Sequence, residues 1–193
     1  MGNLRSVQKA FERINIPAVV TSDKHEIILA DKLILPGVGH FKNGITQLND
    51  LGISDILNKK VLDEKTPILG ICLGMQLFTS YSEEGNCAGL GYFDATTIKF
   101  KTYNAHFKIP HMGWNNVEFN KDCLFSDEIF SSDSFYFVHS YHVECMNKKD
   151  IIGITHYGYT FASAIQKGNI IGVQFHPEKS FKVGLKMLEK FCS

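Results

Sequence analysis

A cysteine between two glycines, at the end of an apolar run, constrains the fold of this chain more than any other feature. The run Pro67–Ile71 is typical of a buried strand, and the residues after Cys72 have the spacing of an amphipathic helix. Cys72 therefore lies at a strand-to-helix turn, where a nucleophile adopts strained backbone angles and needs small neighbours such as Gly70 and Gly74. We expect a tight turn that presents a thiol at the start of a helix, where the helix dipole favours the thiolate.

A His-Pro-Glu sequence follows a second apolar run. Residues Ile170–Phe175 are typical of a strand, and Pro177 biases His176 towards extended backbone. In an extended chain the side chains of His176 and Glu178 project to one side, so the carboxylate can bond one imidazole nitrogen while the other faces the sulfur. The segment predicts a general base and the carboxylate that orients it.

Neither motif is decisive alone. A lone cysteine in a strand is usually a small buried hydrophobe, and His-Pro-Glu is usually a turn. The two patterns are independent, however, so their combination predicts a catalytic set of Cys72, His176 and Glu178. The other four cysteines lack flanking glycines and are interpreted as structural or incidental: Cys87, Cys123, Cys145 and Cys192.

The order of the remaining patterns indicates the fold class. Helices are expected at Leu4–Ile14, with Asn3 as N-cap, and at Phe181–Phe191, and strands at Ala18–Thr21, at Lys32–Leu35 and repeatedly within residues 92–174. Strand and helix alternate first, and a strand-rich part follows. We therefore expect one α/β domain over residues 1–193, with a three-layer open sheet, mostly parallel, and helices on both faces.

Composition excludes several classes of protein. Lys+Arg and Asp+Glu balance at 20 each, so neither nucleic acid nor an anionic membrane is expected as a partner. No apolar run reaches the roughly 20 residues that span a bilayer. The eight histidines are scattered without metal-ligand spacing, so no metal is expected. Five cysteines, an odd number, favour a reducing compartment, and we expect a cytoplasmic protein.

Several segments together resemble the class I (triad) glutamine amidotransferases, from Gly2 to the C-terminus. Two of them, residues 70–76 and 174–178, contain the catalytic set, and three more resemble the glutaminase subunits of imidazole glycerol phosphate synthases: residues 35–39, 110–115 and 135–141. The resemblance implies a flavodoxin-like fold. It also implies hydrolysis of L-glutamine to glutamate and ammonia through a thioester on Cys72, without a cofactor.

The resemblance assigns further roles around the thiol. It implies an oxyanion hole from the backbone of Leu73 and the loop of Gly37, Val38 and Gly39, whose glycines would let a peptide aim its N–H at the oxyanion. It implies substrate binding by Gln76, Glu84, His139, Ser140 and Tyr141. From the residues alone, Glu83 and Glu84 would instead be a solvated acidic pair.

A partner is also implied. In the resembling family the glutaminase docks on a (β/α)₈-barrel cyclase subunit, forming a heterodimer through which ammonia passes. Positions at this interface, or at the gate for ammonia, match Pro110, Trp114, Tyr136 and Lys179. Trp114 suits an interface anchor, although a core position is equally compatible with the sequence.

One departure from the family pattern concerns the N-terminus. Proteins of this kind begin with an apolar strand that leads into the turn matched by residues 2–7, whereas this chain starts at that turn. The first strand is therefore expected to be missing. Its loss would leave backbone groups unpaired and apolar surface uncovered, which lowers a total stability that is typically about 5–15 kcal/mol.

Three functional hypotheses stay open. The first is the glutaminase subunit of imidazole glycerol phosphate synthase, in histidine biosynthesis. The second is a paralogue that supplies ammonia to a sugar amidotransferase in surface polysaccharide biosynthesis. The third is a catalytically inactive docking subunit, which the intact triad opposes. Another Cys/His hydrolase, such as a peptidase, is disfavoured by the match of Gln76, Glu84 and residues 139–141 to a glutamine pocket.

Overall fold

The computed structural model describes residues 3–101, 107–119, 123–127, 129 and 132–193. Its main sheet has the strand order β1-β2-β12-β11-β9-β5-β3-β4, with β10 paired to β11 and β7 paired to β10, while β6 and β8 form a separate ribbon. The strands are β1 (Leu33–Gly37), β2 (Ile68–Cys72), β3 (Thr79–Ser82), β4 (Cys87–Ala88), β5 (Phe93–Lys99), β6 (His111–Asn116), β7 (Glu118–Phe119), β8 (Ser134–His139), β9 (Tyr141–Cys145), β10 (Ile151–Tyr157), β11 (Tyr159–Lys167) and β12 (Ile170–Val173).

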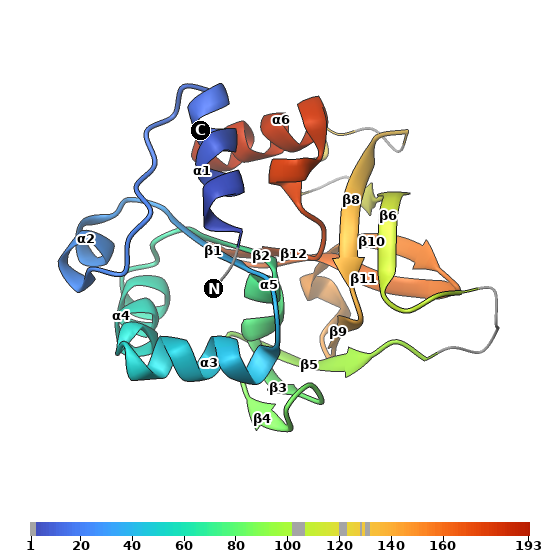
Figure 1. Cartoon of the computed structure of the whole chain (residues 1–193), viewed down its shortest axis with the longest axis horizontal. Coiled ribbons are helices and arrows are strands. Elements are labelled where there is room, and N and C mark those ends of the chain that lie inside the picture. Colours follow the sequence, from blue (N-terminus) through green and yellow to red (C-terminus); the bar gives the residue numbers. More distant parts are fainter. Residues whose placement is uncertain (1–2, 102–106, 120–122, 128, 130–131) are drawn as a thin grey trace.

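Helices cover both faces of the parallel part of the sheet. Helices α1 and α6 lie on one face of β1, β2 and β12, and α3, α4 and α5 lie on the other (Figure 1). The helices are α1 (Leu4–Arg13), α2 (Lys24–Leu29), α3 (Phe41–Asp50), α4 (Ile53–Asn58), α5 (Leu73–Leu77) and α6 (Phe181–Cys192). Strand β2, which ends at the cysteine, therefore runs through the middle of three layers.

The core forms on both sides of β2 because successive side chains of a strand point to opposite faces. Leu69 and Ile71 pack in the cluster that contains Phe11 of α1 and Leu188 of α6. Ile68 packs in the second cluster, with residues of α3, α4 and α5. All five residues of β2 are buried, which explains why its sequence is a continuous apolar run rather than an alternating one.

The α/β class and the helices on both faces are confirmed, whereas the sheet is mixed rather than mostly parallel. Parallel pairing is limited to β1–β2, β2–β12 and β3–β5 among the described strands. Strands β9, β10, β11 and β12 follow one another without a helix long enough for a crossover, so β10, β11 and β12 pair antiparallel as hairpins. The strand-rich character of residues 92–174 is thus the reason for the antiparallel half.

The expected helices at the two ends are confirmed as α1 and α6, but the strand expected at Ala18–Thr21 is wrong. These residues form no strand, and the side chains of Val19 and Val20 are 74% and 45% exposed. Strand β1 pairs only with β2 in the described part of the chain, and no strand precedes α1 there. Residues 18–21 therefore find no neighbouring strand whose backbone could pair with theirs.

Candidate active site

The predicted strand-to-helix turn is present at Cys72. Strand β2 ends at this residue, α5 begins at the next, and Cys72 has φ 54° and ψ −106°, a conformation that L-residues rarely adopt. A Cβ on Gly74 would lie 1.7 Å from the carbonyl oxygen of Leu35, and one on Gly70 would lie 2.5 Å from the Phe78 ring. Both glycines are thus required because the turn is packed against its neighbours. The thiol lies at the carboxyl end of β2.

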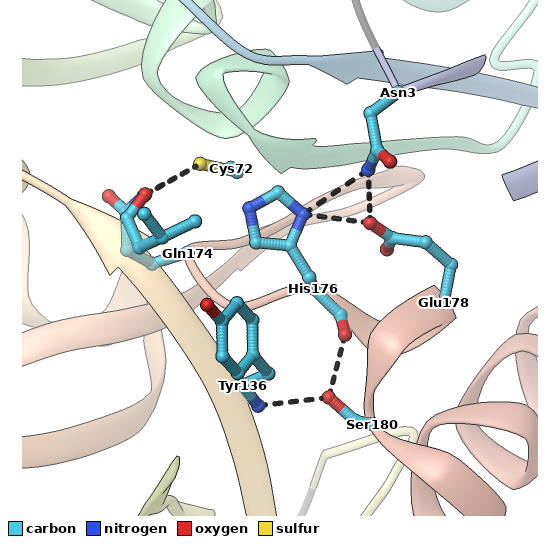
Figure 2. Close-up of polar contacts among 8 residues, drawn as sticks. Asn3, Cys72, Tyr136, Gln174, His176, Glu178 and Ser180 are labelled. Carbon is cyan, nitrogen blue, oxygen red and sulfur yellow. Dashed lines mark hydrogen bonds and ion pairs between the residues drawn. The ribbon is translucent and has the colours of Figure 1, made fainter. Parts of the chain in front are cut away.

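His176 and Glu178 meet as the sequence predicts. His176 has extended backbone, with φ −108° and ψ 92°, and its Nδ1 lies 2.8 Å from Glu178 Oε1. Both side chains are 0% exposed. Figure 2 shows the imidazole between Cys72 and Glu178, with the second ring nitrogen on the side of the sulfur. That nitrogen, Nε2, is buried and has no hydrogen-bond partner among the described residues.

The surroundings of His176 favour its protonated form. Burial by itself lowers the pKa of His176, but the interactions with Cys72 and Glu178 outweigh it and raise this pKa to about 9. The carboxylate also fixes the proton of the neutral ring on Nδ1, because an ionised carboxylate only accepts hydrogen bonds. The ring can therefore take a proton from the sulfur at Nε2 and hold it.

Gln174 is a site residue that the sequence interpretation did not single out. Its Nε2 lies 3.6 Å from Cys72 Sγ, and its Oε1 accepts a 3.0 Å bond from Gln76 Nε2. Gln76 Nε2 also donates to the carbonyl oxygen of Tyr141, at 3.0 Å. Gln174 precedes His176 by two residues, so the same alternation that predicts the position of Glu178 could have found it.

The loop expected to complete an oxyanion hole lies beside the thiol. Gly37, the last residue of β1, is the register partner of Cys72 in β2. Val38 is 38% exposed, and Gly39 has φ +109°, a region that favours glycine. Leu73 begins α5, so its N–H is one of the helix donors without an intrahelical acceptor. The loop and the helix start thus border one another at the sulfur.

Of the residues expected to bind the substrate, Glu84 and Tyr141 lie near one another. Glu84 Oε2 accepts a 2.7 Å bond from the backbone N–H of Phe41, where α3 begins. Desolvation raises the pKa of Tyr141, and the nearby charges of Glu84 and Glu83 raise it further. Ser140 and Tyr141 are partly exposed. Glu84 therefore supplies a negative charge near the Tyr141 side chain.

His139 is buried in a chain of hydrogen bonds that the sequence did not reveal. Its Nδ1 donates to the carbonyl oxygen of Tyr141 at 2.8 Å, so its Nε2 accepts from His111 Nδ1 at 2.9 Å. His111 Nε2 then accepts from Asn115 Nδ2 at 3.3 Å. Burial lowers the pKa of His111 to about 4 and that of His139 well below its usual value. Both rings are therefore neutral, and they anchor the Tyr141 carbonyl.

An exposed aromatic surface adjoins the triad. Trp114, 47% exposed, stacks at 4.9 Å between ring centroids on Phe181, which is 76% exposed. Tyr136 contacts Trp114 edge-on, and Lys179 Nζ lies 5.7 Å from the centre of the Tyr136 ring. With Met112, 61% exposed, these residues form what we call the aromatic patch: Met112, Trp114, Tyr136, Lys179 and Phe181. Sequence reasoning missed Met112 and Phe181.

The backbone of the aromatic patch is hydrogen-bonded to the backbone of His176. The carbonyl oxygen of Tyr136 accepts from the backbone N–H of His176 at 2.9 Å. Ser180 Oγ accepts from the Tyr136 N–H at 3.0 Å and donates to the His176 carbonyl at 2.6 Å, as Figure 2 shows. Pro110 is also exposed, directly before β6. Hydrogen bonds through Tyr136 and Ser180 thus connect the aromatic patch to the backbone of His176.

Two other kinds of site are not found among the described residues. None of their helices is long and apolar enough to cross a membrane. No group of three or more His, Cys, Asp or Glu side chains in this part of the chain could hold a metal ion.

Comparison with known proteins agrees with this geometry. The family Glutamine amidotransferase class-I matches residues 3–193. Imidazole glycerol phosphate synthase subunit HisH 2 of Methanococcus maripaludis is 54% identical over 191 residues, covering 99% of this chain and 94% of that protein. The HisH subunit of Methanocaldococcus jannaschii is 46% identical, with 98% and 93% covered.

Solved structures share the fold. The structure described as a glutamine amidotransferase superposes with a TM-score of 0.76 at 19% identity, covering 100% of this chain and 95% of that one. The glutaminase domain of Trypanosoma brucei CTPS gives a TM-score of 0.66 at 18% identity, with 97% and 87% covered. With a matching family over nearly every residue and an assembled Cys-His-Glu site, this chain belongs to the class I glutamine amidotransferases.

Proposed function

We propose that this chain is the glutaminase subunit of an imidazole glycerol phosphate synthase, built as one domain over residues 1–193. It hydrolyses L-glutamine and supplies the ammonia to a cyclase partner in histidine biosynthesis. The observation that carries the proposal is the strained Cys72 turn, with the His176 imidazole held beside it by Glu178. Similarity to HisH subunits over nearly the full chain supports the choice of pathway.

The first half of the reaction forms a thioester. Cys72 Sγ attacks the side-chain amide carbon of glutamine, and the negative charge that develops on the carbonyl oxygen is stabilised by the N–H of Leu73 and an N–H of the Val38–Gly39 loop. His176 donates its Nε2 proton to the departing nitrogen, and ammonia leaves. The raised pKa of His176 suits this step, because the proton is held on the ring until the leaving group accepts it.

The second half returns the thiol. His176, now neutral, removes a proton from water at Nε2, the water oxygen attacks the thioester carbon, and the C–S bond breaks. Glutamate is released, and the sulfur regains its proton. Glu178 stays ionised throughout and holds the ring through Nδ1, which stabilises the imidazolium formed in each half.

The pocket residues take two kinds of role. Glu84 binds the α-ammonium of glutamine, and the Ser140–Tyr141 backbone receives the α-carboxylate end. Gln76 and His139 use their nitrogens within the protein, since both donate to the Tyr141 carbonyl. We therefore assign Gln76 and His139 to the support of that backbone.

The aromatic patch, with Pro110, is the docking face for the cyclase barrel. A central pair of stacked rings, Trp114 and Phe181, has the size and exposure of an interface anchor. Tyr136 and Lys179 border the triad on this face, which suits a gate through which ammonia enters the partner. Five free thiols fit a reducing compartment, so we place the protein in the cytoplasm.

The test measures glutamate release from glutamine by the purified chain, alone and with an imidazole glycerol phosphate synthase cyclase and its nucleotide substrate. The expected result is hydrolysis that the cyclase stimulates and that Cys72→Ala abolishes. Trp114→Ala and Phe181→Ala should weaken the stimulation and leave unstimulated hydrolysis intact. A folded chain without Cys72-dependent hydrolysis under either condition would contradict the proposal.

A second candidate is favoured by one observation. Methanococcus maripaludis has two numbered HisH subunits, and this chain is 54% identical to HisH 2 and 49% identical to HisH 1. Duplicated subunits leave room for a paralogue that serves a sugar amidotransferase in surface polysaccharide biosynthesis. Hydrolysis that responds to a nucleotide-sugar amidotransferase and not to the cyclase would select this alternative.

A further inference from the structure

Asn3, from the opposite end of the chain, reaches the buried carboxylate of the triad. Its Nδ2 donates to Glu178 Oε1, the oxygen that also binds His176, and lies 3.5 Å from His176 Nδ1 (Figure 2). The other oxygen of Glu178, Oε2, is buried without a hydrogen-bond partner among the described residues. In this part of the chain, the imidazole and the Asn3 amide are thus the two groups that orient the carboxylate.

Chemistry fixes which atom of Asn3 faces the carboxylate. An ionised carboxylate only accepts hydrogen bonds, so the amide must present its NH₂ group. His176 Nδ1 already donates to Glu178 Oε1 and is therefore not an acceptor for the amide. The Asn3 proton consequently goes to the glutamate, and the amide reaches His176 only through it.

The backbone of Asn3 frees its side chain for this contact. Asn3 occupies the N-cap position of α1, where its carbonyl oxygen accepts from the N–H groups of Ser6 and Val7. Asparagine at this position usually caps the helix with its side chain, yet here the side chain makes no cap bond. With φ 74° the residue is left-handed, a conformation that asparagine tolerates better than most residues. The Asn3 side chain therefore bonds Glu178 and leaves the first N–H groups of α1 without a side-chain cap.

We propose that Asn3 is a positioning residue for catalysis: its amide holds the Glu178 carboxylate in the plane that keeps the His176 ring directed at Cys72. This inference rests on the proposed glutaminase activity. A neutral donor suits the task, because it orients the carboxylate without removing the negative charge that stabilises the imidazolium. The residue acts through Glu178 and does not touch the reacting atoms.

The test uses two variants that both keep the left-handed backbone. Asn3→Asp has the same shape but replaces the donor by a charged acceptor, and Asn3→Gly removes the side chain. The matched control is Asn15→Asp, since Asn15 is also left-handed, with φ 55°, and lies exposed at the far end of α1. Thermal unfolding of each variant checks that α1 still forms.

Two readouts separate positioning from folding. For glutamine hydrolysis, Asn3→Asp and Asn3→Gly should lower kcat by roughly tenfold or more with KM changed less than about twofold, because the ring loses its orientation while the pocket is intact. For alkylation of Cys72 by iodoacetamide, Asn3→Asp should shift the pH profile downward by about one unit, since an added negative charge favours the imidazolium and with it the thiolate that reacts. Asn15→Asp should match the parent chain in both.

Alkylation needs no glutamine, so it decides the role of Asn3 independently of the proposed activity. If the parent chain hydrolyses no glutamine, the proposed function fails, and a shifted alkylation profile still supports the coupling of Asn3 to the triad. If Asn3→Gly and Asn3→Asp fold and retain the parent kcat and the parent alkylation profile, the positioning role is refuted.

Discussion

Acid should destabilise this protein through the buried pair His111 and His139. Each ring is neutral in the fold, because the chain of bonds from Asn115 to the Tyr141 carbonyl leaves one donor and one acceptor on each. A proton added to His139 would place its Nε2–H against the N–H of His111, and one added to His111 would place its Nε2–H against the NH₂ group of Asn115. His111 is 2% exposed, so water cannot replace the lost partner.

The size of the effect follows from the pKa of His111. This pKa is about 4 in the folded protein and 6.5 when the side chain is free of the fold. The unfolded chain therefore binds more protons below pH 6.5, so the stabilisation is complete above that value and is lost as pH falls towards 4. At about 1.4 kcal/mol per pKa unit, lowering the pH from about 7.5 to about 5 should cost about 2 kcal/mol through His111 alone.

The assay is urea unfolding of the parent chain and of His111→Gln at both pH values. The glutamine variant keeps a neutral hydrogen-bonding side chain but cannot titrate, so its loss of stability on acidification should be about 2 kcal/mol smaller. Contributions from carboxylates and from His176 are common to both proteins and cancel in the difference. His156→Gln, on an exposed residue of the neighbouring strand β10, should behave like the parent. A difference below about 0.5 kcal/mol between the parent and His111→Gln would refute the reasoning.

Three other outcomes are expected. In urea unfolding, Gly74→Ala should destabilise the fold by more than about 3 kcal/mol, because its Cβ would lie 1.7 Å from the backbone oxygen of Leu35, and it should abolish hydrolysis. The control Gly44→Ala should cost less than about 1 kcal/mol, because its Cβ would lie 3.3 Å from a side chain that can adjust. Gln174→Leu should fold but lower kcat for glutamine by about tenfold, since the contact with Cys72 Sγ is lost; unchanged kinetics would show that this contact is incidental. Calorimetry should give a low unfolding midpoint for residues 1–193, because β1 has an unpaired edge in the described part of the chain, and a high cooperative midpoint would contradict this.

The sequence predicts the parts of the site that depend on local geometry. Glycines on both sides of Cys72 and the alternation around His176 each require only a few neighbouring residues, and both motifs are found as expected. Their meeting across β2 and β12 follows from the parallel pairing of those two strands. Local patterns were therefore sufficient for the two parts of the triad, and the pairing of two distant strands brings those parts together.

Contacts between distant segments could not be predicted in this way. The bond from Asn3 to Glu178 joins residues 175 positions apart, and no local pattern marks an N-cap residue whose side chain turns away from its helix. The strand expected at Ala18–Thr21 has suitable residues, but a strand also needs a neighbour, which the sequence of the segment does not reveal. The mixed sheet likewise depends on antiparallel pairing between strands far apart in the chain, such as β5 with β9.

The peptide of Tyr136 connects the aromatic patch, which we propose as the docking face, to the backbone of His176. The ring of Tyr136 lies on the outer surface beside Trp114, while its backbone accepts from the N–H of His176 and donates to Ser180. A partner that presses on these rings would displace a peptide that is one hydrogen bond from the general base. Assembly and turnover would then be linked without any rearrangement of the sheet, so that ammonia is released fastest when there is a partner to receive it.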